Sequence, residues 1–145
     1  MEEIKIELSI VQKYLEWLKT KLYLHLKADN ASRRAVKRGE VYKCSLGEGI
    51  GSEQCKERPC VILQSNAGNA KSPNTIVAPI THTTSTLQIV VPIADKRNLN
   101  GDVILDGNVL LGNIICVSKA RLGEYVAKLE PKESKILLFE YNNSK

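Results

Sequence analysis

The sequence predicts a mainly β, α+β fold, in which a small barrel or sandwich follows one long helix and precedes a short one. Short apolar runs separated by turn residues fill the segment between residues 40 and 129, which is typical of a small β-barrel or sandwich. Before them, apolar residues recur at alternating steps of four and three, as on one face of a helix. The length of 145 residues fits one domain with appended elements.

The first predicted element is a helix over residues 3–27. Its apolar stripe consists of Ile4, Leu8, Val11, Leu15, Leu18 and Leu22. Such a helix is stable only when the stripe is buried, so we expect it to pack on the rest of the chain, on a second copy or on a partner. We assign residues 1–30 to an N-terminal amphipathic extension, residues 31–38 to a basic linker, and residues 39–145 to the barrel domain.

The strands follow in chain order. We predict them at residues 40–46, 59–63, 75–80, 87–93, 103–105, 109–117 and 124–129. Clusters of glycine, asparagine and proline separate them, at residues 47–51, 66–69, 72–74 and 106–108. Pro131 suits the first turn of a helix, so we predict a short C-terminal helix at residues 131–141.

The net charge of +5 is concentrated in the first quarter of the chain. Residues 1–38 carry nine basic and five acidic side chains, whereas residues 39–145 carry twelve and eleven. Four basic residues fall within six positions: Arg33, Arg34, Lys37 and Arg38. A cluster of this kind often contacts phosphate. A solvated linker is the simpler interpretation of the composition alone.

The four cysteines predict neither a disulfide nor a metal site. The N-terminus carries frequent charges and no secretory signal, so we expect a cytoplasmic protein with reduced thiols. Cys44, Cys60 and Cys116 stand in apolar runs and are predicted to be core residues. Cys55 and Cys60 lack the second ligand pair of a zinc site, and we expect no metal and no cofactor. No apolar stretch approaches the ~18 residues that a membrane-spanning helix needs.

Candidate catalytic groups are polar residues at strand starts and ends. They are Glu53, Gln54, Lys56, Arg58, Thr81 and His82. Loops at one end of a sheet can place such side chains on a common rim, although each could equally be an exposed loop residue. Arg58 is distinctive because Pro59 holds it extended, and its planar guanidinium matches phosphate geometry.

Five ordered motifs lie between residue 37 and about residue 130. They are Arg38-Gly39-Glu40-Val41-Tyr42, Gly49-Ile50-Gly51-Ser52-Glu53-Gln54, Arg58-Pro59-Cys60-Val61-Ile62-Leu63, Asn66-Ala67-Gly68-Asn69 with residues 72–81, and Val117-Ser118-Lys119-Ala120-Arg121-Leu122. In this order and at this spacing they resemble the MazF/PemK (Kid) toxins of type II toxin–antitoxin systems. Ser118 stands where the family often has Asp, and the helix at residues 1–30 has no counterpart in the resemblance.

The resemblance implies an SH3-like β-barrel of the MazF/PemK/CcdB type that forms homodimers. It implies a metal-independent, sequence-specific endoribonuclease that cleaves single-stranded RNA, often mRNA, and so inhibits growth. A cognate antitoxin with an acidic C-terminal tail would block the RNA groove. Arg58 and Thr81 correspond to the catalytic residues. The candidate RNA-binding residues are Glu53, Gln54, Lys56, Asn69 and His82.

The expected reaction is attack of a 2′-hydroxyl on the adjacent phosphorus, which gives a 2′,3′-cyclic phosphate and a 5′-hydroxyl. Arg58 suits charge stabilisation better than proton transfer, because the pKa of arginine exceeds ~12. Thr81 can donate a hydrogen bond to the same phosphate, and the general base stays open between Glu53 and His82.

Two alternatives to an unrestrained nuclease stay open. The barrel could be a catalytically silent module that binds a protein or a nucleic acid, DNA included, as the similarly folded CcdB toxins bind gyrase. The N-terminal helix could instead cover the groove as a built-in inhibitor, or add packing to a dimer or to an antitoxin.

Overall fold

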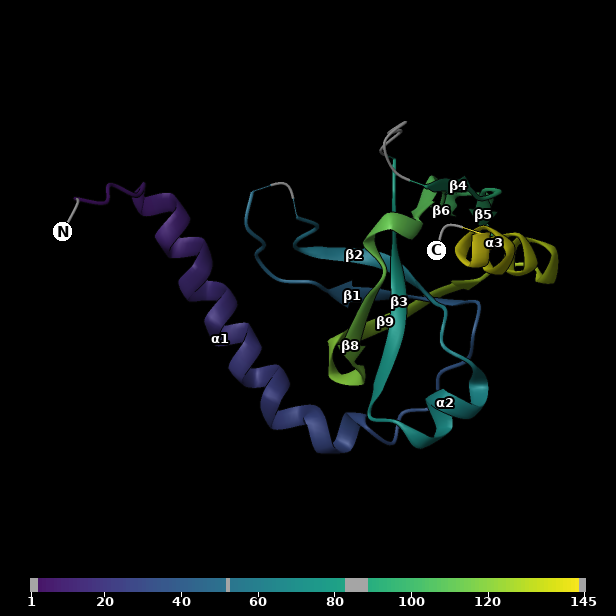
Figure 1. Ribbon diagram of the computed structural model, residues 1–145, viewed down its shortest axis with the longest axis horizontal. Coiled ribbons are helices and arrows are strands. Elements are labelled where there is room, and N and C mark those ends of the chain that lie inside the picture. The colour runs from purple at the N-terminus through teal and green to yellow at the C-terminus, as the bar shows by residue number, and fades with distance from the viewer. Residues whose placement is uncertain (1–2, 52, 83–88, 144–145) are drawn as a thin grey trace.

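Two helices flank an antiparallel sheet in the computed structural model, which describes residues 3–51, 53–82 and 89–143. The long helix α1 (Leu8–Ala31) and the C-terminal helix α3 (Pro131–Asn143) lie on opposite sides of the sheet (Figure 1). Among the described residues, no helix is long and apolar enough to cross a membrane.

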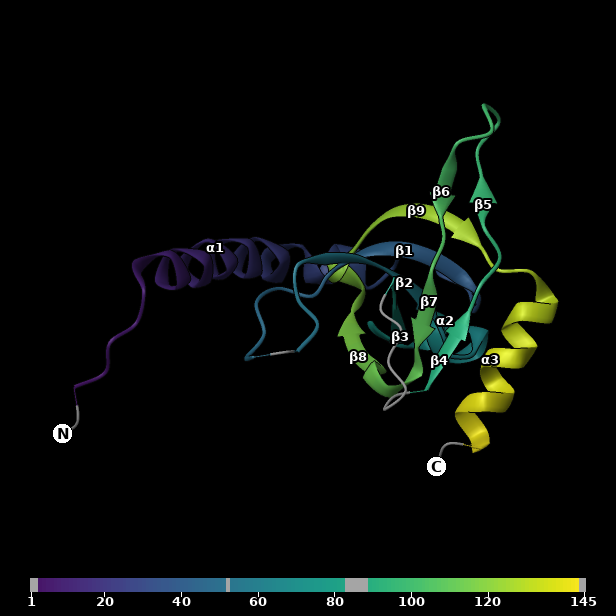
Figure 2. The same ribbon diagram turned by 90° about the horizontal axis from the view of Figure 1, so that it is seen from above.

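The main sheet has seven strands. They are β1 (Glu40–Ser45), β2 (Glu57–Ile62), β3 (Asn74–Thr81), β4 (Val90–Pro92), β7 (Asn108–Leu110), β8 (Ile115–Ser118) and β9 (Leu122–Lys128). Their order is β4-β7-β3-β2-β1-β9, and β8 also pairs with β3. A separate hairpin of β5 (Lys96–Arg97) and β6 (Val103–Leu105) projects from this body (Figure 2). The predicted fold class is confirmed as a barrel-like sheet, which is open because the described parts of β4 and β9 do not pair with each other.

Strands β1 to β3 are apolar on both faces because they lie between two hydrophobic clusters. Val41, Val61 and Ala78 belong to the cluster that Leu137 of α3 covers. Tyr42 and Cys60, one residue away along the same strands, belong to the second cluster with Val36 of the linker. This alternation follows from the two-residue period of a strand, and it explains why the β2 segment is a continuous apolar run.

Most of the predicted elements are observed in the structure, but several of their predicted boundaries are wrong. The N-terminal helix begins at Leu8 rather than residue 3 and continues to Ala31. Residues 66–71 form a short helix, α2 (Asn66–Lys71), which Ser65 caps by accepting a hydrogen bond from the Gly68 amide. The predicted strand at 109–117 is interrupted by the turn η1 (Leu111–Asn113). Of the predicted strand at 87–93, residues 87 and 88 lie outside the described residues.

Most of the surface of helix α1 is exposed to solvent. None of its residues is buried, and its predicted stripe faces solvent, with Leu15 61% and Leu22 58% exposed. The linker that follows is held more firmly, because the Arg34 guanidinium donates to the backbone oxygens of Leu122 and Gly123 and lies over the Tyr42 ring. The stripe expected to be buried is therefore uncovered within one copy of the chain.

Candidate active site

Arg58 and Thr81 lie at the adjoining ends of β2 and β3. These strands pair antiparallel with Cys60 opposite Pro79, Val61 opposite Ala78 and Ile62 opposite Val77. Extending this register by two residues from Cys60 brings Arg58 level with Thr81, and alternation then directs both side chains to the same face. The two residues that the sequence singled out for catalysis are thus brought together at one edge.

The Arg58 side chain has unused hydrogen-bonding capacity. The residue is half-buried, and its Nε is a buried atom with no hydrogen-bond partner among the described residues. Neither Arg58 nor Lys56 forms an ion pair with a described residue. A guanidinium that is not neutralised by a carboxylate of the described residues is suited to bind a group that carries negative charge, such as a phosphate.

Arg58 lies beside two buried thiols. Cys44 pairs with Arg58 across β1 and β2, and Cys44 and Cys60 are fully buried. The pKa of the Cys60 thiol is raised, first by its hydrogen bond with Cys44 and then by burial, while the Arg58 charge acts in the opposite direction. The prediction that both are core residues is confirmed. The same prediction for Cys116 is wrong, because Cys116 is exposed at β8.

Gln54 and Lys56 lie in the β1–β2 loop, which leads directly into Arg58. Gln54 is half-buried, and its Oε1, like the Arg58 Nε, is buried and has no hydrogen-bond partner in the part of the chain that the structure describes. Lys56 is exposed and has a left-handed backbone with φ of 65°. Such a conformation is costly for a residue other than glycine and is often found at functional sites. The loop thus presents an amide and an ammonium group close in sequence to Arg58.

Glu53 and His82, the two candidate bases, are both engaged within the protein. The Glu53 carboxylate accepts a hydrogen bond from the Ile50 amide at 3.0 Å, which closes the tip of the loop. His82 follows Thr81 and is exposed, and its Nε2 lies 2.7 Å from Asp106 Oδ1. A carboxylate that orients an imidazole is an arrangement typical of a general base. Asp106 is therefore a candidate positioning residue, which could not be selected from the sequence beyond its place in a turn.

Asn69 has a structural position. It is 1% exposed, its Oδ1 accepts hydrogen bonds from Gln64 Nε2 and Thr75 Oγ1, and its Nδ2 donates to the Gln64 backbone oxygen. A side chain that is 1% exposed and bonded to its neighbours in this way is not accessible to RNA. We therefore correct the assignment of Asn69 and leave it out of the candidate site.

The late motif around Lys119 also holds the structure together. Lys119 is 2% exposed, and its Nζ donates to the backbone oxygens of Asn69 at 2.5 Å and Ser32 at 3.3 Å. Ser118 accepts a hydrogen bond from the Ala120 amide at 3.2 Å and so caps the turn η2 (Lys119–Arg121). Aspartate caps helical turns in the same way, which explains how serine can replace it here.

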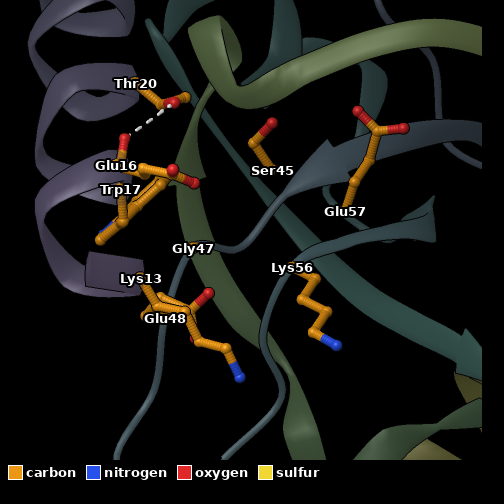
Figure 3. Close-up of a pocket in the computed structure, with 9 residues that line it drawn as sticks. All are labelled: Lys13, Glu16, Trp17, Thr20, Ser45, Gly47, Glu48, Lys56 and Glu57. Carbon is orange, nitrogen blue, oxygen red and sulfur yellow. Dashed lines mark hydrogen bonds between the residues drawn. The ribbon is translucent and has the colours of Figure 1, made fainter. Parts of the chain in front are cut away.

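An open cleft of about 290 Å³ separates α1 from the β1–β2 loop (Figure 3). Its charged lining consists of Lys13, Glu16, Glu48, Lys56 and Glu57. Because three carboxylates outnumber two ammonium groups, this cleft disfavours binding of the phosphate backbone of RNA. Among the described residues, no group of three or more potential metal ligands occurs anywhere. The features suited to phosphate thus lie at Arg58 rather than in the cleft.

Comparison with known proteins gives matches along most of the chain. A family model described as "PemK-like, MazF-like toxin of type II toxin-antitoxin system" matches residues 37–138. An endoribonuclease MazF of Staphylococcus saprophyticus is 36% identical over 112 residues, which cover 75% of this chain and 87% of that protein. Helix α1 lies before the residues that the family model matches.

Solved structures share the fold. An endoribonuclease in complex with its cognate antitoxin from a mycobacterial species is 25% identical, with a TM-score of 0.58 over 77% of this chain and 98% of that chain. MazF of Deinococcus radiodurans is 16% identical, with a TM-score of 0.64 over 77% of this chain and 96% of that chain. At that identity the second likeness shows the fold alone.

Proposed function

Because the chain belongs to the PemK-like, MazF-like family of type II toxin–antitoxin toxins, we propose that it is an endoribonuclease toxin that cleaves single-stranded RNA at Arg58 and Thr81. The observation that carries the proposal is the Arg58 guanidinium, which forms no ion pair with a described residue, at the strand end shared with Thr81. In a cell, cleavage of cytoplasmic mRNA would inhibit growth.

The reaction needs no group that the chain lacks. The 2′-oxygen forms a bond to the adjacent phosphorus, the bond from phosphorus to the 5′-oxygen breaks, and a 2′,3′-cyclic phosphate and a 5′-hydroxyl result. Arg58 stabilises the charge that develops on the non-bridging oxygens, and Thr81 donates a hydrogen bond to the same phosphate. A protein base accepts the proton of the 2′-hydroxyl, either Glu53 or His82 with its partner Asp106, and a proton reaches the leaving oxygen from water.

Gln54 and Lys56 bind the RNA beside the scissile phosphate. Lys56 neutralises a neighbouring phosphate, and the Gln54 side-chain amide forms a hydrogen bond with a nucleobase. Glu53 shapes the loop through its bond to the Ile50 amide. The protein acts as a homodimer. An antitoxin with an acidic tail binds the same basic groups, and while it is bound the RNA is not cleaved and growth continues.

The test is cleavage of an RNA pool by the purified chain in EDTA. We expect products with 5′-hydroxyl and 2′,3′-cyclic phosphate ends, and no cleavage of an oligonucleotide whose scissile nucleotide lacks the 2′-hydroxyl. A requirement for a divalent metal, or cleavage of the deoxy substrate, contradicts the mechanism. Intact RNA together with tight RNA or protein binding would instead favour a silent binding module.

A further inference from the structure

Helix α1 contacts the β1–β2 loop through two aromatic residues. The Tyr14 hydroxyl donates a hydrogen bond to the Gly49 backbone oxygen at 3.0 Å, across 35 positions of sequence. The Trp17 ring lies against Gly47, where a Cβ atom would come within 2.2 Å of Trp17 Cε2. Figure 3 shows α1 and the loop as opposing walls of one cleft, with Trp17 directed from the helix toward the loop.

Trp17 contacts two parts of the barrel. Its ring lies against Gly47, and the Arg121 guanidinium lies over the ring, 5.4 Å from its centroid. Arg121 also donates to the backbone oxygen of Ser45 at 3.1 Å. These two contacts of Trp17 tie α1 to the end of β1 and to η2, and a cation over an aromatic face adds to their stability.

The position of Gly47 determines the position of Lys56. The Lys56 amide donates to the Gly47 oxygen at 2.5 Å, and the Leu46 amide donates to the Lys56 oxygen at 2.8 Å. These bonds close the base of the loop two residues before Arg58. A movement of Gly47 would thus move Lys56, whose left-handed backbone already needs support from its surroundings.

We propose that α1 is a brace, in which Tyr14 and Trp17 hold the β1–β2 loop in the conformation that binds RNA. This role rests on the proposed function, because it assigns the brace to the loop that carries Gln54 and Lys56. Tyr14 and Trp17 are positioning residues that act through Gly49 and Gly47. The brace is opposite in effect to a helix that inhibits: releasing an inhibitory helix raises activity, whereas releasing a brace weakens RNA binding.

Trp17→Ala in the full chain tests the brace, with Trp17→Phe as the conservative variant. Leu18→Ala is the matched control, because Leu18 is 50% exposed on the same helix. We expect hydrogen exchange at the Leu46 and Lys56 amides to accelerate about tenfold in Trp17→Ala and to recover largely in Trp17→Phe. We also expect KM for RNA to rise roughly three- to tenfold with kcat little changed, since the loop binds rather than reacts.

Tyr14→Phe removes only the hydroxyl and provides a milder test should Trp17→Ala unfold. Its control is Tyr23→Phe, the same change at an exposed position of α1. Unchanged amide exchange in both Trp17→Ala and Tyr14→Phe overturns the brace. Faster exchange with an unchanged KM, or with higher activity, overturns the positioning role. A wild-type chain that cleaves no RNA contradicts the proposed function, while the exchange rates still decide whether α1 holds the loop.

Discussion

Trp17 and Gly47 fit together so closely that no side chain can be added to Gly47: a Cβ atom there would lie 2.2 Å from Trp17 Cε2. Gly47 also has a φ of +81°, a backbone conformation that other residues rarely adopt. The contact joins a helix that the family match does not include to the loop before Arg58. It makes the N-terminal extension part of the architecture of the candidate site.

Gly47→Ala should detach α1 and destabilise the chain by about 1–3 kcal/mol, through steric clash added to backbone strain. Gly51→Ala is the control, because Gly51 also has a positive φ, +60°, but nothing lies within 4 Å of its added Cβ. Trp17 is the only tryptophan, so its fluorescence reports docking of α1. A red shift in Gly47→Ala alone is expected, and equal spectra for the two variants would contradict the contact.

Asn69→Ala should lower the free energy of unfolding by about 1–3 kcal/mol, because it removes the acceptor of the buried Thr75 hydroxyl and the donor to the Gln64 backbone oxygen. Asn100→Ala, at an exposed turn, is the control and should change little. The measurement is urea unfolding, together with RNA affinity of the folded variants. A stable Asn69→Ala chain with weakened RNA binding would restore Asn69 to the binding site.

Lys119→Met should also destabilise, by about 1–3 kcal/mol, since methionine fills the space of the stem but donates nothing to the Asn69 and Ser32 oxygens. Lys128→Met, an exposed position in β9, controls for loss of a positive charge. Urea unfolding distinguishes them. Equal stability of both variants would show that the buried ammonium contributes nothing.

Glu133 at the start of α3 predicts a pH dependence. Burial alone would raise its pKa, but hydrogen bonds from Lys96, the Ala94 amide and the Glu130 amide together lower it below the usual value. A lowered pKa means that this carboxylate stabilises the fold fully above about pH 5 and loses its contribution as the pH falls through the folded-state pKa.

Glu133→Gln should therefore be less stable than wild type at neutral pH, and the difference should shrink as the solution is acidified toward about pH 3. Glu130→Gln, at an exposed neighbouring position, is the matched control. Unfolding free energies across this pH range give the answer. A stability difference that stays constant or grows on acidification would contradict the assignment.

Local patterns predicted the strands better than the helix ends. The strand predicted at 75–80 is observed as Asn74–Thr81, because a β-branched apolar run between turns has few other structures open to it. The spacing of Ile4 with Leu8 continued the helical period, yet the chain turns helical only at Leu8, since spacing carries no information on where capping begins. Helix α2 escaped prediction because Asn66, Gly68 and Asn69 favour turns, and the helix that Ser65 caps is only six residues long.

The residues of the candidate site that lie at strand ends could be predicted from the sequence. The roles of residues that depend on contacts between distant parts of the sequence could not. Arg58 and Thr81 follow from motifs, and the β2–β3 register brings them level. The burial of Asn69 depends in part on Lys119, fifty positions later, which no local pattern reveals. The packing of Trp17 on Gly47 depends likewise on how α1 folds back, which the heptad-like stripe did not indicate.

The most direct test of the account compares cleavage of one RNA oligonucleotide in EDTA by wild type, Arg58→Ala and Arg97→Ala. Arg97 is an exposed arginine of β5 that pairs with Asp95, far in sequence from the candidate site. If Arg58 stabilises the charge on the scissile phosphate, Arg58→Ala should lower kcat by about a hundredfold or more, with wild-type unfolding behaviour, whereas Arg97→Ala should cleave normally. Undiminished cleavage by a folded Arg58→Ala chain would contradict the central claim.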